Sequence, residues 1–554
     1  MKNIHEYHQR SKHRLNQYAQ GPGYLDWETQ PNPFRVYEGA QRTRLPLAME
    51  FSAVPYGAIF GEFFTEPYPL NLESVSMFLR LSLSLAAWKQ FQGARWALRV
   101  NPSSGNLHAE EGYIITGGAP GLPEGVYHYH SRSHALELRL GKRSEAMGVM
   151  LDEYEKMDNV FTRQDIFLMG FTSIHWREAW KYGERAFRYC QLDLGHALFC
   201  VRAAAAALGW SARLATGASD GMISSLLGIS RQEDFAGAET ESPGPMVIIS
   251  TTGRMPGDLD ETFDSAARHV ILHAARDDSW KGRANTLSAS HAHDWPAIDQ
   301  AARLVFKPAT EEQFDTPPEP APLPASMCDK PAAWIIMTRR SAQAYDRVSL
   351  MPPDKFIRIV SALIPRPDMP PWDIIPWPAT VHPFLFVHRV QDFAPGIYAL
   401  VRRQGEVEAL QKAMGGKYAW GHPPAAPEGL PLYLLKQMDA RGTAAMTSCQ
   451  QDIAGDGAFS VAMVARFAGP LAIGPWWYRR IHWEAGAVGQ ALYLEAEAAG
   501  FRGTGIGCYF DDMFHSTLGL EGDEFQDLYH FTVGAAVEDE RLVTTPPYEE
   551  REVE

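Results

Sequence analysis

Two stretches of the chain present apolar and polar positions in the same order. In each, a short apolar run (GYIITGG in the first, PFLFVHRV in the second) has the composition of a buried strand, and an Ala-rich run of helical length follows later. The pattern predicts long helices that open at Asp193–Gly195 and Glu484–Gly486 and end at Gly209 and Gly500, where glycine accepts the left-handed backbone of a helix C-terminus. Strands mixed with long helices, without regular βαβ alternation, predict an α+β fold.

The Ala-rich helix and the residues after it occur twice. Arg188–Gly228 aligns with Arg479–Gly519 at a constant offset of 291 residues without a gap, and ten of the 41 aligned pairs are identical. Unrelated sequences of ordinary composition would match at roughly two or three positions. A shared alanine bias does not explain the aligned glycines or the DxMxxSxLG pattern, so we predict a tandem repeat. The identical pairs are Arg188/Arg479, Gly195/Gly486, Ala205/Ala496, Ala207/Ala498, Gly209/Gly500, Asp220/Asp511, Met222/Met513, Ser225/Ser516, Leu227/Leu518 and Gly228/Gly519.

A Pro-rich segment separates the two copies. Residues 307–331 have the prolines and acids of an extended, solvated linker. A second match, PEGVYHY (Tyr127) with APGIYAL (Tyr398), runs at an offset of 271, so the second copy carries extra residues between its two matched blocks. We predict a first copy, residues 1–306 with an N-terminal extension, and a second copy, residues 332–554.

Composition and charge narrow the classes of protein. The 554 residues are 45% hydrophobic and 11% aromatic, which supports a large folded core and excludes disordered and fibrous classes. The formal net charge is −15, and a negative field repels phosphate backbones and anionic lipid headgroups, so we expect neither nucleic acid nor a membrane surface as a partner. The first residues lack the apolar run of a signal peptide, and no stretch is long and apolar enough to span a bilayer. We expect a cytoplasmic protein.

Cysteine spacing and the common catalytic motifs add little chemistry. HExxH, GxSxG, GxxxxGK[ST] and EF-hand patterns are absent, which leaves metalloprotease, serine-hydrolase, P-loop and calcium-binding functions without support. His291 and His293 are interpreted as solvated loop histidines, and we expect no metal site. The cysteines show no CxxC spacing and fit a reducing compartment better than a disulfide framework. They are Cys190, Cys200, Cys328, Cys449 and Cys508.

Four motifs in a fixed order resemble the flavin-dependent nitroreductase superfamily. They are PSSGN (Pro102–Asn106), KYGERAFRYCQLDLGHA (Lys181–Ala197), TRRSAQAYD (Thr338–Asp346) and GTGIGCYFDD (Gly503–Asp512). Within the superfamily, KYGER and the LYHFTVG that ends at Gly534 look most like the SagB/ThcOx dehydrogenase branch. The resemblance implies an α+β sandwich that binds FMN between two subunits. With two copies in one chain, it implies an intramolecular pseudo-dimer, for which a monomeric chain is sufficient.

The resemblance also implies that the two copies supply different parts of an FMN site. Arg339 and Ser341 match the cation and hydroxyl of an RxS phosphate site, and the glycines of GTGIG let the backbone approach a flat ring. Gln343 stands where the family has a basic residue, and Arg541 in the C-terminal tail would compensate for it. The predicted cofactor-binding residues are Pro102, Ser103, Ser104, Asn106, Arg339, Ser341, Gly503, Gly505, Ile506, Gly507 and Arg541.

Each copy lacks what the other keeps. The three glycines of GTGIG align with Ala212, Leu214 and Thr216, and the offset of 271 places DIIPW, not PSSGN, in the second copy. The first copy also lacks an RxSxR pattern in the expected place. Since a fused pseudo-dimer can lose one of two symmetry-related sites, we predict one FMN site per chain, between the copies.

Lys181 and Tyr182 resemble the Lys-Tyr pair that azoline dehydrogenases have near the flavin. A lysine or tyrosine acts as a base only if burial or a neighbouring charge lowers its pKa. The alternative is a structural lysine that packs or pairs with Glu184, and Glu110 and His108 are further candidates for the substrate face.

Three functions remain open at the level of sequence. The first is an FMN-dependent dehydrogenase that oxidises an azoline-type heterocycle in a modified peptide or small molecule, which Lys181 and Tyr182 favour. The second is an NAD(P)H-dependent reductase of nitro or quinone compounds, which nothing in the sequence excludes. The third is a non-catalytic flavin-binding or scaffold protein, which the decay of one site and Gln343 favour.

Overall fold

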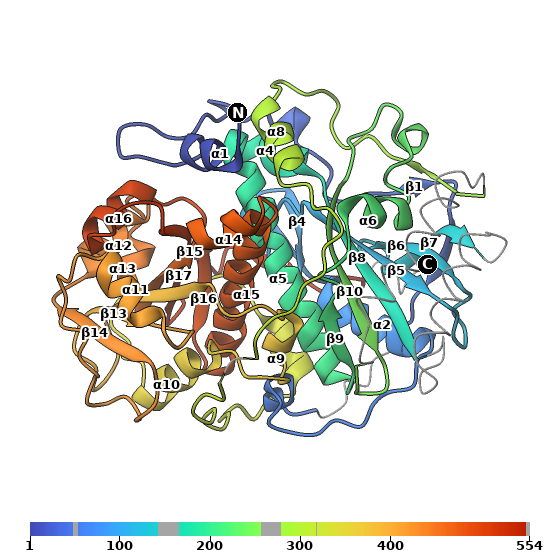
Figure 1. Cartoon of the computed structure of the whole chain (residues 1–554). Coiled ribbons are helices and arrows are strands. Elements are labelled where there is room, and N and C mark those ends of the chain that lie inside the picture. The colour runs from blue at the N-terminus through green and yellow to red at the C-terminus, as the bar shows by residue number, and fades with distance from the viewer. Residues whose placement is uncertain (48–53, 142–164, 256–278, 317, 550–554) are drawn as a thin grey trace.

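Two long helices, α5 (Ala186–Ala207) and α15 (Trp477–Ala498), lie against each other in the middle of the molecule, with one β-sheet beyond each of them (Figure 1). The computed structural model describes residues 1–47, 54–141, 165–255, 279–316 and 318–549. Every residue of α5 and all but the last two of α15 are buried. The two helices therefore form the centre of the core.

The starts of these helices correct the sequence-based prediction. We expected them to open at Asp193 and Glu484, but both acidic residues lie inside their helices, about two turns from the first residue. Both carboxylates accept backbone hydrogen bonds from loops outside their helices, so they do not cap the helices to which they belong. The predicted ends are confirmed, because Gly209 and Gly500 directly follow the C-cap residues with φ of 68° and 76°.

The first sheet has seven strands, and each pairs antiparallel with its neighbours. The apolar run around Tyr113 forms β5, as predicted, in the middle of this sheet. The strands, in spatial order, are β2 (Gln41–Arg44), β7 (Ala135–Gly141), β6 (Gly125–His130), β5 (Glu110–Thr116), β8 (Ile166–Ser173), β10 (Ser242–Ser250) and β9 (Ser211–Leu214).

The second sheet has six strands and is also antiparallel. The apolar run around Phe384 forms β12, again as predicted. The strands, in spatial order, are β14 (Leu432–Gln437), β13 (Gly396–Leu400), β12 (Val381–Val387), β15 (Phe459–Arg466), β17 (Phe525–Gly534) and β16 (Arg502–Ile506).

Apart from β2, the two sheets have the same strand order. The series β7-β6-β5-β8-β10-β9 in the first sheet corresponds to β14-β13-β12-β15-β17-β16 in the second. A short helix precedes each long one, α4 (His175–Tyr182) or α14 (Ala468–Ile473), and another follows the next strand, α6 (Asp220–Leu226) or α16 (Asp511–Leu518). The elements therefore repeat along the chain in the same way as the aligned sequences.

The long helices meet at two aligned glycines. A Cβ added to Gly195 would lie 2.2 Å from the carbonyl oxygen of Trp483, and one added to Gly486 would lie 2.1 Å from that of Leu192. Each added Cβ would also lie 2.9 Å from the Cα of the other glycine. Equivalent positions of the two copies thus meet each other, as they do on a two-fold axis.

Two buried ion pairs join the copies reciprocally. Arg188 of the first copy donates from Nη1 to Oδ1 of Asp511 in the second at 2.8 Å. Arg479 of the second copy donates from Nη2 to Oδ1 of Asp220 in the first at 2.9 Å. The four side chains are two identical pairs of the repeat, so each copy supplies the same arginine and the same aspartate to the other.

The remaining elements cover the sheets and connect them. The C-terminal strand β18 pairs with β3, so the end of the second copy lies on the first-sheet side of the molecule (Figure 1). Within 307–316 and 318–331, no residue belongs to a helix or an extended strand. None of the helices in the described part of the chain has the length and apolarity that a bilayer crossing requires. These elements are α1 (Ile4–Arg10), β1 (Tyr37–Glu38), α2 (Leu72–Ser82), β3 (Leu85–Phe91), β4 (Ala94–Arg99), β11 (Arg283–Ala284), α8 (Pro296–Leu304), α9 (Ala332–Thr338), α10 (Pro353–Ala362), α11 (Glu406–Ala413), α12 (Arg441–Thr447), α13 (Ile453–Asp456) and β18 (Val543–Thr545).

Candidate functional site

The PSSGN loop, residues 102–106, connects β4 to β5 and is held by its own polar groups. Gly105 and Asn106 both have left-handed backbone, with φ of 59°. The Asn106 amide nitrogen donates to the carbonyl of Ala97 at 2.7 Å, and its Oδ1 lies 3.0 Å from Nε2 of His108. The Asn106 side chain therefore fixes the loop on β4. Pro102 is half-buried beside it.

Two buried carboxyl groups lie under the serines of this loop. Asp193 of α5 accepts from the backbone N–H of Ser104 at 3.0 Å and from its hydroxyl at 3.0 Å. Glu178 of α4 accepts from the hydroxyl of Ser103 at 3.4 Å. The helices of the first copy thus set the position of the loop from below.

Lys181 and Tyr182 end α4 and face the same loop. A Cβ added to Gly105 would lie 2.5 Å from Tyr182 Oη and 3.1 Å from Lys181 Nζ, so it would displace the ends of these side chains, and the left-handed backbone at this position also favours glycine. Burial raises the pKa of Tyr182 well above its usual value, and Glu178 raises it further. Tyr182 is therefore a phenol at neutral pH and is suited to donate a hydrogen bond.

The pairing of Lys181 with Glu184, considered above as a structural alternative, is not formed. The Glu184 carboxylate accepts from Arg10 Nε at 2.6 Å, and Tyr7 donates to the Glu184 carbonyl at 2.7 Å. Glu184 therefore attaches the N-terminal helix α1 to the end of α4. His108 and Glu110 are buried behind the PSSGN loop and do not line an exposed face.

The glycines of GTGIG lie on β16 at the edge of the second sheet, with Gly507 just after its end. A Cβ added to Gly503 would lie 2.6 Å from the ring of Phe531, and one added to Gly505 would lie 1.9 Å from Tyr529 Oη. Aromatic side chains of β17 therefore occupy the space above these glycines. Ile506, between them and Gly507, is buried in the core of the second sheet.

Tyr189 of α5 joins the two parts of the site. Its hydroxyl donates to the carbonyl of Gly507 at 2.9 Å, and its ring lies 4.5 Å from the ring of Tyr182, centroid to centroid. A Cβ added to Gly507 would lie 2.4 Å from the Tyr189 ring. The predicted residues of the first copy and the GTGIG strand of the second are thus brought together through one side chain.

Arg339 and Ser341 follow α9 and lie between the copies. Arg339 is 4% exposed, and its Nη2 donates to the carbonyls of Arg99 and Val100, just before the PSSGN loop, at 3.2 Å each. Its Nε is buried and has no hydrogen-bond partner within the described residues. The Ser341 hydroxyl lies 2.8 Å from Tyr493 Oη, which in turn accepts from the Gly505 N–H at 3.0 Å. This group connects the RxS residues to GTGIG.

Arg541 lies apart from this group. Its side chain is 74% exposed and pairs with Asp539, Nη2 to Oδ2 at 2.8 Å. The guanidinium lies over the ring of Phe91, 5.5 Å from its centroid. Gln343, the residue for which Arg541 was expected to compensate, is exposed.

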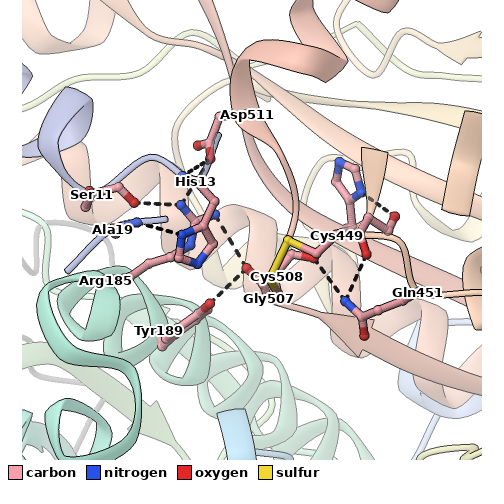
Figure 2. The surroundings of a disulfide bond; sticks show 12 residues. Ser11, His13, Ala19, Arg185, Tyr189, Cys449, Gln451, Gly507, Cys508 and Asp511 are labelled. Atoms are coloured by element: carbon pink, nitrogen blue, oxygen red, sulfur yellow. Dashed lines mark hydrogen bonds and ion pairs between the residues drawn. A yellow bond between two sulfur atoms is a disulfide. The ribbon is translucent and has the colours of Figure 1, made fainter. Parts of the chain in front are cut away.

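A disulfide between Cys449 and Cys508 directly follows the GTGIG strand (Figure 2). This corrects the expectation that the cysteines are unpaired. The two Cα atoms lie 5.7 Å apart although the residues are 59 positions apart in sequence, because the turn after α12 lies against the end of β16. Gln451 in that turn donates from Nε2 to the Cys508 carbonyl at 3.1 Å. Such proximity depends on tertiary structure and leaves no signal in cysteine spacing.

Sequence reasoning missed the tyrosines that line this region. Tyr189, Tyr493 and Tyr529 come from α5, α15 and β17, and each contacts a glycine of GTGIG. His196 Nε2 lies 3.1 Å from Tyr529 Oη, so it too belongs here. The available signal was helical spacing, since Tyr189 and His196 are seven positions, or about two turns, apart on one face of α5.

His291 forms a contact outside this site. Its ring stacks on Trp176 with centroids 3.8 Å apart, and its Nε2 lies 3.1 Å from Glu239. Within the described residues, no group of three or more histidines, cysteines or acidic residues is arranged to hold a metal ion.

Comparison with solved structures identifies the fold. A provisionally assigned nitroreductase from Anabaena variabilis superposes with a TM-score of 0.68 and covers 97% of this chain and 100% of its own, at 19% sequence identity. The chain therefore has a mixed α/β, nitroreductase-like fold over almost its whole length. A chain of the E. coli microcin synthetase McbBCD complex covers 45% of this chain and 82% of its own at 17% identity, with a TM-score of 0.26 that is too low to support an inference.

Sequence comparison gives one partial match. Trifolitoxin-processing protein TfxB of Rhizobium leguminosarum bv. trifolii is 29% identical over 137 residues, which are 24% of this chain. The match spans 35% of TfxB, so about two thirds of the length of TfxB lies outside the matched region. No protein-family model matches the chain.

Proposed function

We propose that this chain is an FMN-dependent oxidoreductase with one site, formed between its two copies. The observation that carries the proposal is the convergence of the two complementary motif sets. Tyr189 of the first copy bonds Gly507 of the second, and Arg339 of the second copy bonds Val100 of the first. Neither copy alone holds both the PSSGN loop and the GTGIG strand.

The residues between the copies fit FMN. Arg339 is a buried cation with a free Nε, and Ser341 adds a hydroxyl, which together suit a phosphate. The glycines of Gly503–Gly507 carry no side chains, but aromatic side chains of the protein already occupy the space that their Cβ atoms would fill, so a flat ring would bind beside the strand backbone and not in that space. When bound, FMN would supply a two-electron acceptor or donor in hydride transfer. Arg541, which faces solvent, is not part of this set.

We infer further that the fold arose by tandem duplication and that the chain acts as an intramolecular pseudo-dimer without a second subunit. The matched strand orders, the glycine contact between Gly195 and Gly486 and the reciprocal ion pairs support this inference. The same symmetry defines a second position, which we call the counterpart site. There, β9 of the first copy takes the place of β16, and residues 373–377 of the second copy take the place of residues 102–106. Since the counterpart site lacks both motifs, one flavin per chain is proposed.

For the reaction, we propose a SagB/ThcOx-like dehydrogenation of an azoline-type heterocycle in a modified peptide or small molecule. Lys181 faces the loop as the candidate base, and Tyr182 is the hydrogen-bond donor beside it. The partial relative TfxB is named for the processing of trifolitoxin, and a processing reaction is the class of reaction proposed here. A nitro or quinone reductase is the second candidate, because the protonated Tyr182 suits proton delivery to a reduced product as well.

Three measurements test this proposal. The purified chain is expected to contain close to one FMN, to be monomeric in solution and to lose flavin absorbance anaerobically with an azoline-containing peptide. Bleaching by NAD(P)H with no response to azoline compounds would favour the reductase. A chain that binds two FMN molecules, or none, would contradict the single-site proposal, and bound FMN that neither donor reduces would favour the non-catalytic alternative.

A further inference from the structure

Three carboxyl groups lie buried together beneath the PSSGN loop with one arginine among them. Glu178, Asp193 and Glu110 are 0%, 2% and 1% exposed. Glu110 lies 3.7 Å from Nη1 of Arg99, whereas Glu178 and Asp193 have no ion pair within the described residues. Glu178 Oε2 also has no hydrogen-bond partner there. Burial strongly disfavours an ionised carboxylate that has no cation beside it. Acids in such a place therefore call for an explanation other than the stability of the fold.

Glu178 lies between the loop and the candidate catalytic residues. Its Oε1 accepts from Ser103 at 3.4 Å. It precedes Lys181 and Tyr182 by three and four residues on α4, so the three side chains share one face of the helix. Asp193, on α5, binds the adjacent Ser104 from the same side.

The counterpart site is built without these uncompensated charges. Glu484, which aligns with Asp193, accepts from Arg402 Nη1 at 2.5 Å and so has its own cation. Gly469 stands in place of Glu178 when the offset of 291 is continued into the preceding helix. The equivalent elements of the second copy therefore fold with one acid, Glu484, that is paired with an arginine, and with no acid in place of Glu178. Retention of Glu178 against its desolvation cost points to function.

We propose that Glu178, together with Asp193, holds the proton that the reaction exchanges with Lys181. This inference rests on the function proposed above. Bound FMN would supply the hydride acceptor for oxidation of the substrate, in which one bond to hydrogen breaks with loss of a hydride and a second breaks with loss of a proton to Lys181. Lys181 passes that proton to the Glu178–Asp193 pair, which holds one proton before the step and two after it. A two-electron acceptor such as dioxygen then takes the hydride equivalent and the proton and leaves as hydrogen peroxide.

The groups that face Glu178 support a stored proton. Burial raises the pKa of Glu178 well above its usual value, Asp193 on α5 and Glu110 on β5 raise it further, and Lys181 on its own helix lowers it. Burial and Glu110 likewise raise the pKa of Asp193, while the hydroxyls of the loop serines lower it. Ser103 bonds the Glu178 carboxyl and lowers its pKa only in part.

Infrared spectroscopy of the full-length apoprotein tests this inference, because a protonated carboxyl has a C=O stretching band that an ionised one lacks. At about pH 7, the wild-type protein is expected to show this band and Glu178→Gln to have lost it. Glu484→Gln is the matched control, since it removes the aligned acid of the other copy and is expected to keep the band. Asp193→Asn removes the neighbouring charge and is expected to shift the titration of the Glu178 band to lower pH.

The outcomes separate this inference from the function on which it rests. Identical bands in the wild type and Glu178→Gln would overturn it, as would a band in Asp193→Asn that titrates at the wild-type pH. The measurement needs neither flavin nor substrate. An ionised Glu178 therefore overturns the stored proton alone, whereas a chain that binds no FMN overturns the proposed function.

Discussion

The candidate site and the counterpart site are formed by aligned residues but differ in what fills them. In the candidate site, PSSGN and GTGIG present hydroxyls, an amide and bare backbone. In the counterpart site, Trp377 stands for Asn106, and the Arg480 guanidinium lies 5.1 Å from the Trp377 ring and pairs with Glu312 at 2.8 Å. A cavity of about 1610 Å³ beside it is lined by β9, by the loop that contains Trp377 and by residues of the linker. Under the proposed duplication, the scaffold has been conserved and one site has been free to change.

The segments that cover the two sites are equivalent as well. The backbone of His13 forms two hydrogen bonds with Asp511. The His13 N–H donates to Oδ2 of Asp511 at 3.0 Å, and the His13 carbonyl accepts from the Asp511 N–H at 3.2 Å. Lys307 forms the same two bonds with Asp220, at 2.7 Å and 3.0 Å. The N-terminal segment and the start of the linker therefore have the same relation to the two aligned aspartates.

The largest expected effect concerns the reciprocal ion pairs, which are not equally supported. Asp511 faces two arginines, Arg185 and Arg188, whereas the ion pair of Asp220 among the described residues is with Arg479 alone. Although burial opposes ionisation of Asp511, the two arginines hold its pKa below the usual range. Asp511→Asn should lower the free energy of unfolding by about 3–5 kcal/mol, because it leaves two buried cations without an anion. Asp220→Asn should cost less.

Denaturant unfolding of the two variants and the wild type checks this order. Equal midpoints for the two variants, or a larger loss of stability for Asp220→Asn, would contradict the view that the ion pairs of Asp511 are the stronger set.

The next effect distinguishes the two sites by their flavin contacts. Arg339→Ala removes a buried cation beside Ser341, and a charge-assisted hydrogen bond of this type contributes about 1.5–3 kcal/mol. FMN affinity should fall by roughly 10- to 150-fold, as measured by flavin fluorescence during titration of the apoprotein. Arg213→Ala, an exposed arginine that lines the counterpart cavity, is the matched control and should leave the affinity unchanged. A Kd that changes in Arg213→Ala and not in Arg339→Ala would place the flavin in the counterpart site and contradict the proposal.

A smaller effect tests the symmetry that relates the sites. Gly195→Ala and Gly486→Ala each direct a Cβ at a backbone carbonyl of the opposite helix. Both should destabilise the protein, by about 1–3 kcal/mol and to a similar extent, because they strain the same contact. Gly221 lies in helix α6, and a Cβ added to it would contact Phe306 at 3.9 Å, an ordinary van der Waals distance. Gly221→Ala should therefore be neutral or stabilising. Thermal unfolding of the three variants compares them. A loss at only one of the two helix positions would show that they are not equivalent.

The helix ends were predictable, and the repeat could be proposed, because both depend on residues close together in sequence. Gly209 and Gly500 mark helix ends by their own backbone conformation, and the ten identities lie in one ungapped block. The starts of α5 and α15 were misplaced because an acid near a helix start is normally read as a cap. Asp193 instead serves a loop from another part of the chain, and local sequence does not carry that information.

The motifs of the candidate site could be recognised in the sequence, whereas the contacts between them could not. Ser104, Lys181 and Gly507 were found through resemblance, and the structure brings their segments together. Glu178 and Tyr189 carry no motif of their own, and their importance comes from burial and from partners far away in sequence. The equivalent contacts of His13 and Lys307 were also missed, because the residues that precede them share little sequence.

The smallest expected effect concerns Arg541, the predicted cofactor-binding arginine that lies on the exposed surface. Arg541→Ala removes a side chain that is 74% exposed and pairs only with Asp539 and the face of Phe91, so FMN affinity and the midpoint of unfolding should both stay at wild-type values. The comparison with Arg339→Ala is informative, because both residues are arginines of the second copy and differ in burial. Flavin titration of the two variants in parallel is the measurement. If Arg541→Ala weakens FMN binding as much as Arg339→Ala does, the C-terminal tail must close over the phosphate when flavin is present. The compensation for Gln343 expected from the sequence would then be correct, and the phosphate site would contain two cations.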